Sequence, residues 1–566
     1  MNNTKLRKLL IACTVTALGF FTVSFTDKHN FELAKNLEIY FNVIKELDIN
    51  YVDEIEPEKL ITKSIEEMLS SLDPYTNYIS EEDMEDFNFM TTGEYAGIGS
   101  IITRGQDSTV YIAEPYEGKP AQKAGLKAGD KIISVQGKST KGMDVADVSS
   151  LLKGAANENV EIIVRRYGEK KDRTFNVLRE VVSISPVPYY GMVDNKVGYV
   201  KFTSFTENCS SVLKDAIKAL TDSLGAESII LDLRDNGGGL LHESVKICNF
   251  FIPKNKEVVS TRGKMKAQDR TFYTKEEPLW ADMPIAVLVN GSSASAAEIV
   301  SGTIQDFDRG VLIGNRTFGK GLVQTTRDVG YNSQIKLTTA KYYIASGRCI
   351  QALDYSHRNS DGSVDHVSDS LISEFKTDNG RIVYDGGGIV PDEIVKLPKF
   401  SKISFELINA SLFFEYANKF CYETPSIASP DNFKITDEIY RDFIAFVKNK
   451  DFSYQSRTDS KIKDLIKTAK DEKYYDIAKD DIEKLEATLS HDIEKDMMLF
   501  QDEIKLILKE ELVGRYYYQK GVIKSLLSDD IQLAKAKEIL NNKEQYDNYF
   551  AKGTVIKDKK TSSDNE

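Results

Sequence analysis

The chain has 566 residues, which is too many for a single hydrophobic core, so we expect about two to four domains. Hydrophobic residues make up 41% of it and charged residues 28%, a composition that excludes a largely disordered protein. The net charge of −13 argues against nucleic acid as a partner, because the chain has no excess of basic residues to neutralise phosphates.

Residues 1–26 have the pattern of a targeting segment. Lys5, Arg7 and Lys8 precede an apolar run from Leu9 to Phe25, which is typical of a signal peptide or an N-terminal membrane anchor. The run is short of the ~20 residues that span a bilayer comfortably, and no clear cleavage site follows it, so both alternatives stay open. In either case we expect the body of the protein in the cell envelope outside the cytoplasm, either periplasmic or anchored in the inner membrane.

Residues 27–92 predict a helical region, because apolar residues recur at helical spacing from Leu33 to Leu47 and Pro57 can open a second helix. Residues 93–180 predict a small β-rich domain, with strands near 101–102, 110–112, 132–135 and 160–164 and a helix over 145–152. The loop that precedes the first of these strands reads Tyr95-Ala96-Gly97-Ile98-Gly99, and its glycines allow backbone amides to approach a bound group.

Residues 181–399 predict an α/β body. The apolar run from Ile229 to Leu233 indicates a buried strand followed by a glycine-rich loop. The run from Ala286 to Val289 indicates a second strand, which leads through a turn to a helix that opens at Ser295. A strand, a glycine loop and a helix can bind phosphate, but neither Gly-Lys-[Ser/Thr] nor GxGxxG is present, which disfavours a nucleotide site.

Ser295 and Lys320 form a candidate nucleophile and base. A serine hydroxyl needs a base beside it, and a lysine can be that base when burial favours its neutral form. The Ala296 amide, at a helix N-terminus, is suited to stabilise an oxyanion, and Gln324 lies near enough in sequence to orient the amine. A helix-capping serine and a solvated lysine would give the same pattern, and His242 leaves a Ser–His arrangement open.

The serine segment, residues 292–299 (SSASAAEI), and the lysine segment, residues 314–324 (GNRTFGKGLVQ), resemble the active-site segments of the carboxy-terminal processing proteases, also called tail-specific proteases. The resemblance extends from about Tyr51 to Asp392. It implies that Ser295 is the nucleophile, Lys320 the general base and Gln324 the residue that orients the base.

The resemblance also covers the loop after the first strand of the body. It implies that Gly238 supplies a second oxyanion donor beside Ala296. Gly237 stands where the family often has proline, which leaves the loop less fixed. Ala297 stands where the family often has serine, but that position is not the nucleophile.

Residues 118–138 resemble a PDZ domain. Such domains bind a peptide as an added strand and hold its terminal carboxylate on loop amides. The resemblance therefore implies that Tyr95, Ala96, Gly97, Ile98 and Gly99 bind the C-terminus of a substrate. A PDZ domain that only holds other domains together is the alternative.

Residues 400–556 predict a helical domain, and the polar residues 557–566 predict a disordered tail. Apolar residues from Ile482 to Ile507 follow the helical period. We expect this stripe to pack on the body or on another subunit, in which case the C-terminal helices would form a homo-oligomer.

These observations predict a multidomain α+β protein with N-terminal helices, a PDZ domain, an α/β protease body of the ClpP/crotonase-like type and a C-terminal helical domain. The predicted function is that of a serine endopeptidase that cleaves protein substrates near a free C-terminus, without a metal or cofactor. The alternatives are a catalytically silent PDZ scaffold or adaptor of the cell envelope and another acyl-transfer enzyme, which the PDZ insertion disfavours.

Overall fold

A computed structural model describes residues 29–359, 361–454, 457–489, 492–553 and 555–556. The predicted targeting segment and the predicted tail lie outside these residues. The chain divides into two compact units, the first made of residues up to Tyr78 with Thr326–Leu337 and the second of Ile79–Thr325 with the residues from Thr338 onward. Over the described ranges, every helix is too short or too polar to cross a membrane.

The first unit contains a helix over residues 29–50 and a second helix, α2 (Pro57–Ser70). Pro57 lies in the first turn of α2, as the sequence predicts, because proline there loses no intrahelical hydrogen bond. The second unit begins with α3 (Met84–Thr92), which ends at Gly93 in a left-handed conformation.

The PDZ domain follows α3 in the second unit. Its sheet has the order β3 (Ser100–Arg104), β4 (Val110–Pro115), β5 (Lys131–Val135), β7 (Asn159–Arg165) and β8 (Arg173–Leu178), with β6 (Lys138–Ser139) paired to β5. Strand β3 therefore lies at one edge. Helix α5 (Val145–Leu152) packs beside it and is capped by Asp144, whose side chain accepts a hydrogen bond from Asp147. Strands β3, β4, β5 and β7 and the helix agree with those predicted, whereas β6 and β8 were not predicted.

A separate ribbon connects the predicted PDZ domain to the α/β body. It pairs β2 (Glu94–Gly97) with β9 (Glu180–Ser183) in antiparallel register, with Tyr95 opposite Val182. The loop between β2 and β3 is thus held at both ends by strands.

The α/β body is built on one sheet with the strand order β10 (Tyr189–Met192), β11 (Val197–Lys201), β12 (Ser228–Asp232), β15 (Ile285–Val289), β16 (Val311–Gly314) and β21 (Glu393–Ile394). The strands from β11 to β21 are parallel, and β10 is antiparallel to β11. The central strands are continuous apolar runs because helices cover both faces of the sheet.

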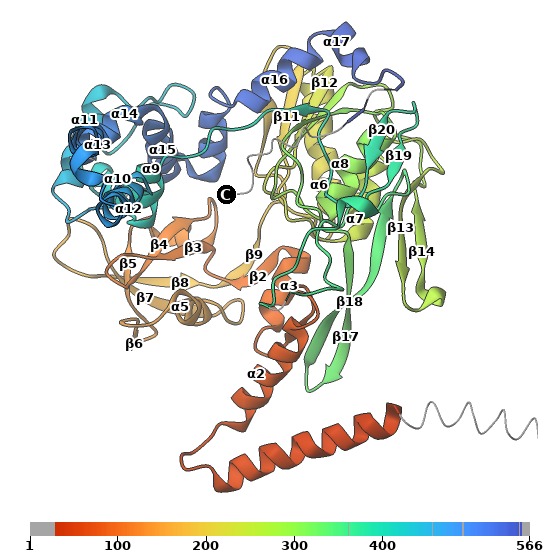
Figure 1. The fold of residues 1–566 in the computed structure, drawn as a ribbon, viewed down its shortest axis with the longest axis horizontal. Helices are drawn as coiled ribbons and strands as arrows, with labels where there is room; N and C mark the ends of the chain where they lie inside the picture. Colours follow the sequence, from red (N-terminus) through yellow and green to blue (C-terminus); the bar gives the residue numbers. More distant parts are fainter. Residues whose placement is uncertain (1–28, 360, 455–456, 490–491, 554, 557–566) are drawn as a thin grey trace, which may run out of the picture. The chain divides into compact units, whose positions relative to one another are not determined.

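The two faces are covered by helices from different parts of the chain. Leu231 and Val287 face the core formed by α6 (Cys209–Lys218), α7 (Leu241–Cys248) and α8 (Ala296–Asp306). On the other face, α16 (Ile531–Leu540) and α17 (Lys543–Asn548) pack through the buried side chains Leu533, Ala536, Ile539 and Tyr546. Figure 1 shows α16 beside β12.

The predicted C-terminal helical domain is therefore divided between two cores. Helices α9 (Lys402–Asn409), α10 (Leu412–Glu423), α11 (Asp437–Lys448), α14 (Ile493–Leu499) and α15 (Gln501–Leu526) form a core of their own. The predicted apolar stripe also does not follow one helix, since α13 (Tyr475–Leu489) ends before Asp492, which caps α14. Asparagine and aspartate favour such caps over helix interiors.

A long hairpin follows, and its far part, Thr326–Leu337, belongs to the first unit. It consists of β17 (Leu322–Gly330) and β18 (Ser333–Ile344), and the end of β18 pairs with β13 (Glu257–Gly263), which in turn pairs with β14 (Arg270–Tyr273). The hairpin starts directly after Lys320.

Candidate active site

The candidate site lies at the carboxyl ends of β12 and β15. These strands are parallel neighbours, with Asp232 opposite Leu288. The glycine-rich loop therefore begins beside the turn that leads to Ser295. The carboxyl edge of a parallel sheet is where α/β proteins commonly bind their ligands.

Ser295 has an unusual backbone conformation, with φ 56° and ψ −114°. A side chain at positive φ crowds the backbone, and such strain of about 1–3 kcal/mol is held mainly at functional sites. Ser295 is the N-cap residue of α8, so it directly precedes the backbone amides of the first helical turn. Its carbonyl oxygen accepts a hydrogen bond of 3.2 Å from the hydroxyl of the buried Tyr342.

A buried glutamate on α8 joins the serine and lysine segments. One carboxylate oxygen of Glu298 accepts hydrogen bonds from the backbone amides of Ser295, at 2.8 Å, and Lys320, at 2.9 Å. Its other oxygen accepts from the Thr317 hydroxyl at 2.6 Å and the Gly319 amide at 2.7 Å. The two segments are thus fixed to each other through one side chain.

The Glu298 side chain is fully buried, and burial raises the pKa of its carboxyl from 4.5 to about 7. The four hydrogen bonds act in the opposite direction because they stabilise the ionised form. All four donors point at carboxylate oxygens, so a proton on Glu298 would displace one of them. Above a pH of about 7, the ionised carboxylate therefore accepts from all four donors.

The glycine-rich loop contacts the serine turn directly. Gly238 has φ +94°, and a Cβ atom there would lie 2.7 Å from the Ala294 carbonyl oxygen and 2.8 Å from Ser295 Cβ. The Gly238 amide donates a hydrogen bond of 2.9 Å to the side-chain oxygen of Asn236. The Asn236 carbonyl in turn accepts from the Ala294 amide. Gly238 therefore lies beside Ser295, with its amide engaged within the loop.

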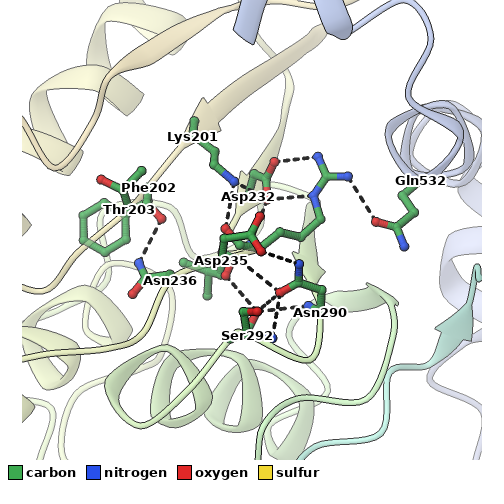
Figure 2. A network of polar contacts seen from close by, with 12 residues as sticks. Lys201, Phe202, Thr203, Asp232, Asp235, Asn236, Asn290, Ser292 and Gln532 are labelled. Carbon is green, nitrogen blue, oxygen red and sulfur yellow. Dashed lines mark hydrogen bonds and ion pairs between the residues drawn. The ribbon is translucent and has the colours of Figure 1, made fainter. Parts of the chain in front are cut away.

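Polar side chains hold this loop against the sheet and the serine turn (Figure 2). The Asn236 amide group donates to the Phe202 carbonyl at 2.8 Å, and Asn290 exchanges hydrogen bonds with Asp235 through its own side-chain amide. Because Asn290 follows β15 and Asp235 follows β12, these bonds connect the two loops. Ser292 also donates its backbone amide to the Asn290 side chain.

A buried ion pair at the end of β12 connects this strand with the C-terminal helices. Arg234 donates to Asp232 and to Asp530, both at 2.6 Å, and to Gln532 at 3.0 Å. Burial alone would raise the pKa of Asp232, but Arg234 and Lys201 outweigh burial and hold it below its usual value. The loop is thus anchored to the segment that covers the far face of the sheet.

The predicted base and its orienting residue lie on the next loop and strand. Lys320 is half-buried and its amide is held by Glu298. Gln324, on β17, donates its side-chain amide to the Thr338 hydroxyl on β18 at 3.2 Å. His242, the alternative base, is 57% exposed on α7 and contacts the carboxylate of Glu243.

The predicted peptide-binding loop borders a cavity of about 270 Å³ in the PDZ domain. Tyr95 and Ile98 line it, together with residues from the edge strand β3 and from the end of α5. Gly97 and Gly99 are closely packed, because a Cβ atom would lie 2.8 Å from the Tyr95 ring at Gly97 and 2.6 Å from Lys119 at Gly99. The prediction of a loop over Tyr95–Gly99 is wrong for its first three residues, because Tyr95, Ala96 and Gly97 lie in strand β2, where Ala96 pairs with Val181 of β9. Only Ile98 and Gly99 lie between β2 and β3.

Two groups of residues at the site were not predicted from the sequence. Glu298 follows Ser295 by three positions, the spacing of a capping box, and this signal could have identified it. Asn236 and the Asp232–Arg234 pair carry no such local signal, because their partners lie on distant segments of the chain.

Comparison with known proteins identifies the family. Residues 196–355 match peptidase family S41, residues 111–166 match the PDZ domain, and residues 403–540 match a family described as the C-terminal helical domain of a probable PDZ-protease.

Among relatives, the carboxy-terminal-processing protease of Bartonella bacilliformis is 34% identical over 333 residues, which cover 58% of this chain and 76% of that protein. The carboxy-terminal processing protease CtpA of Bacillus subtilis is 35% identical, over 54% of this chain and 65% of that protein. The solved structure of a photosystem II D1 C-terminal processing protease is 30% identical and covers 55% of this chain and 89% of that one, with a TM-score of 0.34. The chain therefore belongs to the carboxy-terminal processing proteases, serine peptidases of family S41.

Proposed function

We propose that this peptidase cleaves polypeptides near their C-terminus with Ser295 as the nucleophile and Lys320 as the general base. The observation that carries the proposal is the shared carboxylate of Glu298, which accepts hydrogen bonds from the amides of both residues. The two backbone nitrogens therefore lie closer together than the sum of those two bond lengths. A nucleophile and its base must lie within hydrogen-bond reach of each other. A serine on a strained turn and a half-buried lysine, with their backbones held by one carboxylate, suit these two roles.

In the proposed reaction, neutral Lys320 takes the proton of the Ser295 hydroxyl as its oxygen attacks the peptide carbonyl carbon. The resulting oxyanion is stabilised by the Ala296 amide at the start of α8 and by the Gly238 amide, which must turn from Asn236 toward the substrate. Lys320 then gives the proton to the leaving amine. Water then hydrolyses the acyl-enzyme: Lys320 takes a proton from the water as it attacks the acyl carbon and gives it to the Ser295 oxygen as the acyl bond breaks.

Gln324 is proposed to orient the lysine through its side-chain carbonyl. Its amide nitrogen already donates to Thr338, which fixes the direction of the side chain. The carbonyl oxygen is then the group that can accept from the Lys320 amine. Metal ions and cofactors have no step in this mechanism.

The substrate C-terminus is proposed to bind in the PDZ groove. An extended peptide can add to the edge strand β3, and the segment from Tyr95 to Gly99 lies at one end of that strand. The basic and apolar pattern of residues 1–26 supports a location outside the cytoplasm, in the cell envelope.

The test is degradation of an unfolded protein with a free apolar C-terminus by the wild-type chain, Ser295→Ala and Lys320→Ala. We expect cleavage by the wild type and none by either variant, with all three equally folded by circular dichroism. Full activity of Lys320→Ala would refute the dyad and direct attention to His242. Inactive wild-type protein that still binds the substrate would instead favour the scaffold.

A further inference from the structure

Tyr342 contacts both the serine and the lysine segments from a strand later in the chain. It lies on β18, where it pairs with Thr261 of β13, and it is buried, with 1% of its surface exposed. Its hydroxyl donates a hydrogen bond of 3.2 Å to the Ser295 carbonyl oxygen, and its backbone amide donates one of 2.9 Å to the Gly321 carbonyl oxygen. One residue thus holds the backbone of both segments, as Glu298 does.

Tyr342 and Glu298 bind complementary groups of these segments. At Ser295, Glu298 accepts from the amide and Tyr342 donates to the carbonyl. At the lysine, Glu298 accepts from the Lys320 amide and Tyr342 donates to the carbonyl of the next residue. The direction in which a side chain leaves the backbone depends on the amide and carbonyl groups on either side of it. Contacts on both sides therefore fix that direction, which a contact to the amide alone does not.

The strand that carries Tyr342 packs closely against α8. Gly302 of α8 has no room for a side chain, because a Cβ atom there would lie 2.6 Å from Ile344 Cδ1. Ile344 lies two residues after Tyr342 and so shares its face of β18, and both side chains belong to the core of the body. This packing gives the Tyr342 hydroxyl a fixed place beside the start of α8.

We propose that Tyr342 is a positioning residue whose hydroxyl aligns the Ser295 side chain with Lys320 for proton transfer. This inference rests on the proposed function, in which Ser295 is the nucleophile and Lys320 its base. Proton transfer requires the two groups within hydrogen-bond reach, and a small displacement of either costs much of the rate. Loss of the hydroxyl should therefore lower kcat and leave KM unchanged, because the buried Tyr342 side chain acts through the protein backbone.

The test is Tyr342→Phe in the full-length protein, which removes the hydroxyl and keeps the ring. The Ser295 carbonyl retains hydrogen bonds of 2.9 Å from the Glu298 and Ile299 amides, so it is not left unsatisfied and the variant should fold. One measurement is steady-state kinetics on a fluorogenic peptide. The other is the rate at which a small fluorophosphonate labels Ser295, which reports the reactivity of the serine without peptide binding. Ser295→Ala verifies which residue is labelled.

Tyr440→Phe is the matched control for this variant. Tyr440 lies in the core of the C-terminal helices, is 2% exposed, and also donates its hydroxyl to a backbone carbonyl, that of Met497. It therefore reports the effect of losing a buried tyrosine hydroxyl away from the site. A further variant carries 4-aminophenylalanine at position 342, which restores a hydrogen-bond donor on the ring.

We expect Tyr342→Phe to lower kcat and the labelling rate about tenfold each, with KM unchanged. Tyr440→Phe should keep the wild-type values, and 4-aminophenylalanine at position 342 should recover most of the loss. Wild-type kcat and labelling rate in folded Tyr342→Phe would overturn the positioning role, as would equal losses in Tyr440→Phe. Wild-type protein that is labelled no faster than Ser295→Ala would refute the proposed nucleophile, and this inference with it.

Discussion

Glu298 and Lys320 are joined by a hydrogen bond of 2.9 Å between the Glu298 carboxylate and the Lys320 backbone amide, although 22 positions separate them in the chain. The same oxygen accepts from the Ser295 amide. In a fully buried site, four donors around one carboxylate leave little freedom for either loop. Glu298 is therefore a positioning residue, since it acts on the reaction through the backbone of the two residues proposed to perform it.

Replacing Glu298 with glutamine should show whether this residue positions the site or only stabilises the fold, because the two roles predict different losses of kcat/KM and of stability. The glutamine NH2 group would face two donors that need an acceptor, so about 1–3 kcal/mol of stability should be lost. Displacement of the nucleophile or base by about 1 Å should lower kcat/KM about 100-fold. Steady-state kinetics on a fluorogenic peptide measures the effect.

The matched control for this variant is Glu243→Gln. Glu243 is also buried in the protease body, where it accepts from the Ser210 amide at 2.9 Å and from Lys246 at 2.6 Å. Its substitution should cost stability without a comparable loss of kcat/KM in the protein that remains folded. Equal kinetic losses in the two variants would show that Glu298 contributes to folding alone.

The buried Glu298 carboxyl should also make stability depend on pH. Its pKa rises from 4.5 to about 7 on folding, so between these values the folded state holds a proton that the unfolded state has released. Stability contributed by the protonated form is present below pH 4.5 and is lost as pH rises to about 7, by up to about 1.4 kcal/mol per pH unit. Above pH 7 this contribution should be constant.

Glu298→Gln isolates that contribution, because glutamine resembles the protonated acid at every pH. The unfolding midpoints of wild type and variant are measured in urea from pH 4.5 to 8. The wild-type midpoint should fall relative to that of the variant as pH rises, and the difference should level off near pH 7. A difference that is flat from pH 4.5 to 7 would mean that the hydrogen bonds outweigh burial and keep the carboxyl ionised throughout.

A methyl group at Gly238 should abolish activity while the protein stays folded. A Cβ atom there would lie 2.8 Å from Ser295 Cβ and 2.9 Å from the Ala296 nitrogen, and φ +94° strains any side chain. The loop must retreat from the nucleophile, so Gly238→Ala should lower kcat/KM at least about 100-fold. Gly237→Ala is the control, since a Cβ atom at Gly237 meets nothing within 4 Å. It should keep nearly full activity, and comparable losses at both positions would remove the special role of Gly238.

The sequence predicted those elements whose burial is evident from local pattern. The runs 229–233 and 286–289 were recognisable as strands because β12 and β15 are covered on both faces and tolerate only apolar side chains. The helix over 145–152 appears as α5 with the predicted bounds. The position of Ser295 before α8 followed from turn chemistry, which depends only on neighbouring residues.

Interactions between distant segments could not be predicted in this way. Arg234 and Asp530 are separated by 296 positions, and nothing in either segment indicates that they meet. The packing of α16 and α17 on the sheet was also not expected, because their apolar residues would suit a helical bundle equally well. The Gly238 amide was assigned from resemblance, and its hydrogen bond to Asn236 depends on a loop conformation that spacing does not specify.

The backbone strain at Ser295 leads to a prediction about stability that is independent of the hydroxyl. Glycine adopts φ 56° and ψ −114° far more easily than a residue with a Cβ atom does. Ser295→Gly and Ser295→Ala both lack the Ser295 hydroxyl, so their difference in unfolding free energy reports on the backbone. We expect the glycine variant to be more stable by about 1 kcal/mol, as measured by thermal unfolding of the inactive proteins.

Ser301 provides the control for this comparison, because it lies inside α8, where the backbone is regular and glycine is unfavourable. At this position Ser301→Ala should be more stable than Ser301→Gly, by about 1 kcal/mol. Opposite signs at the two positions would show that the active-site turn is held in a conformation that its own side chain opposes. The same sign at both, with alanine preferred, would mean that the turn at Ser295 is not strained, and that the rigidity of the site comes from Glu298 alone.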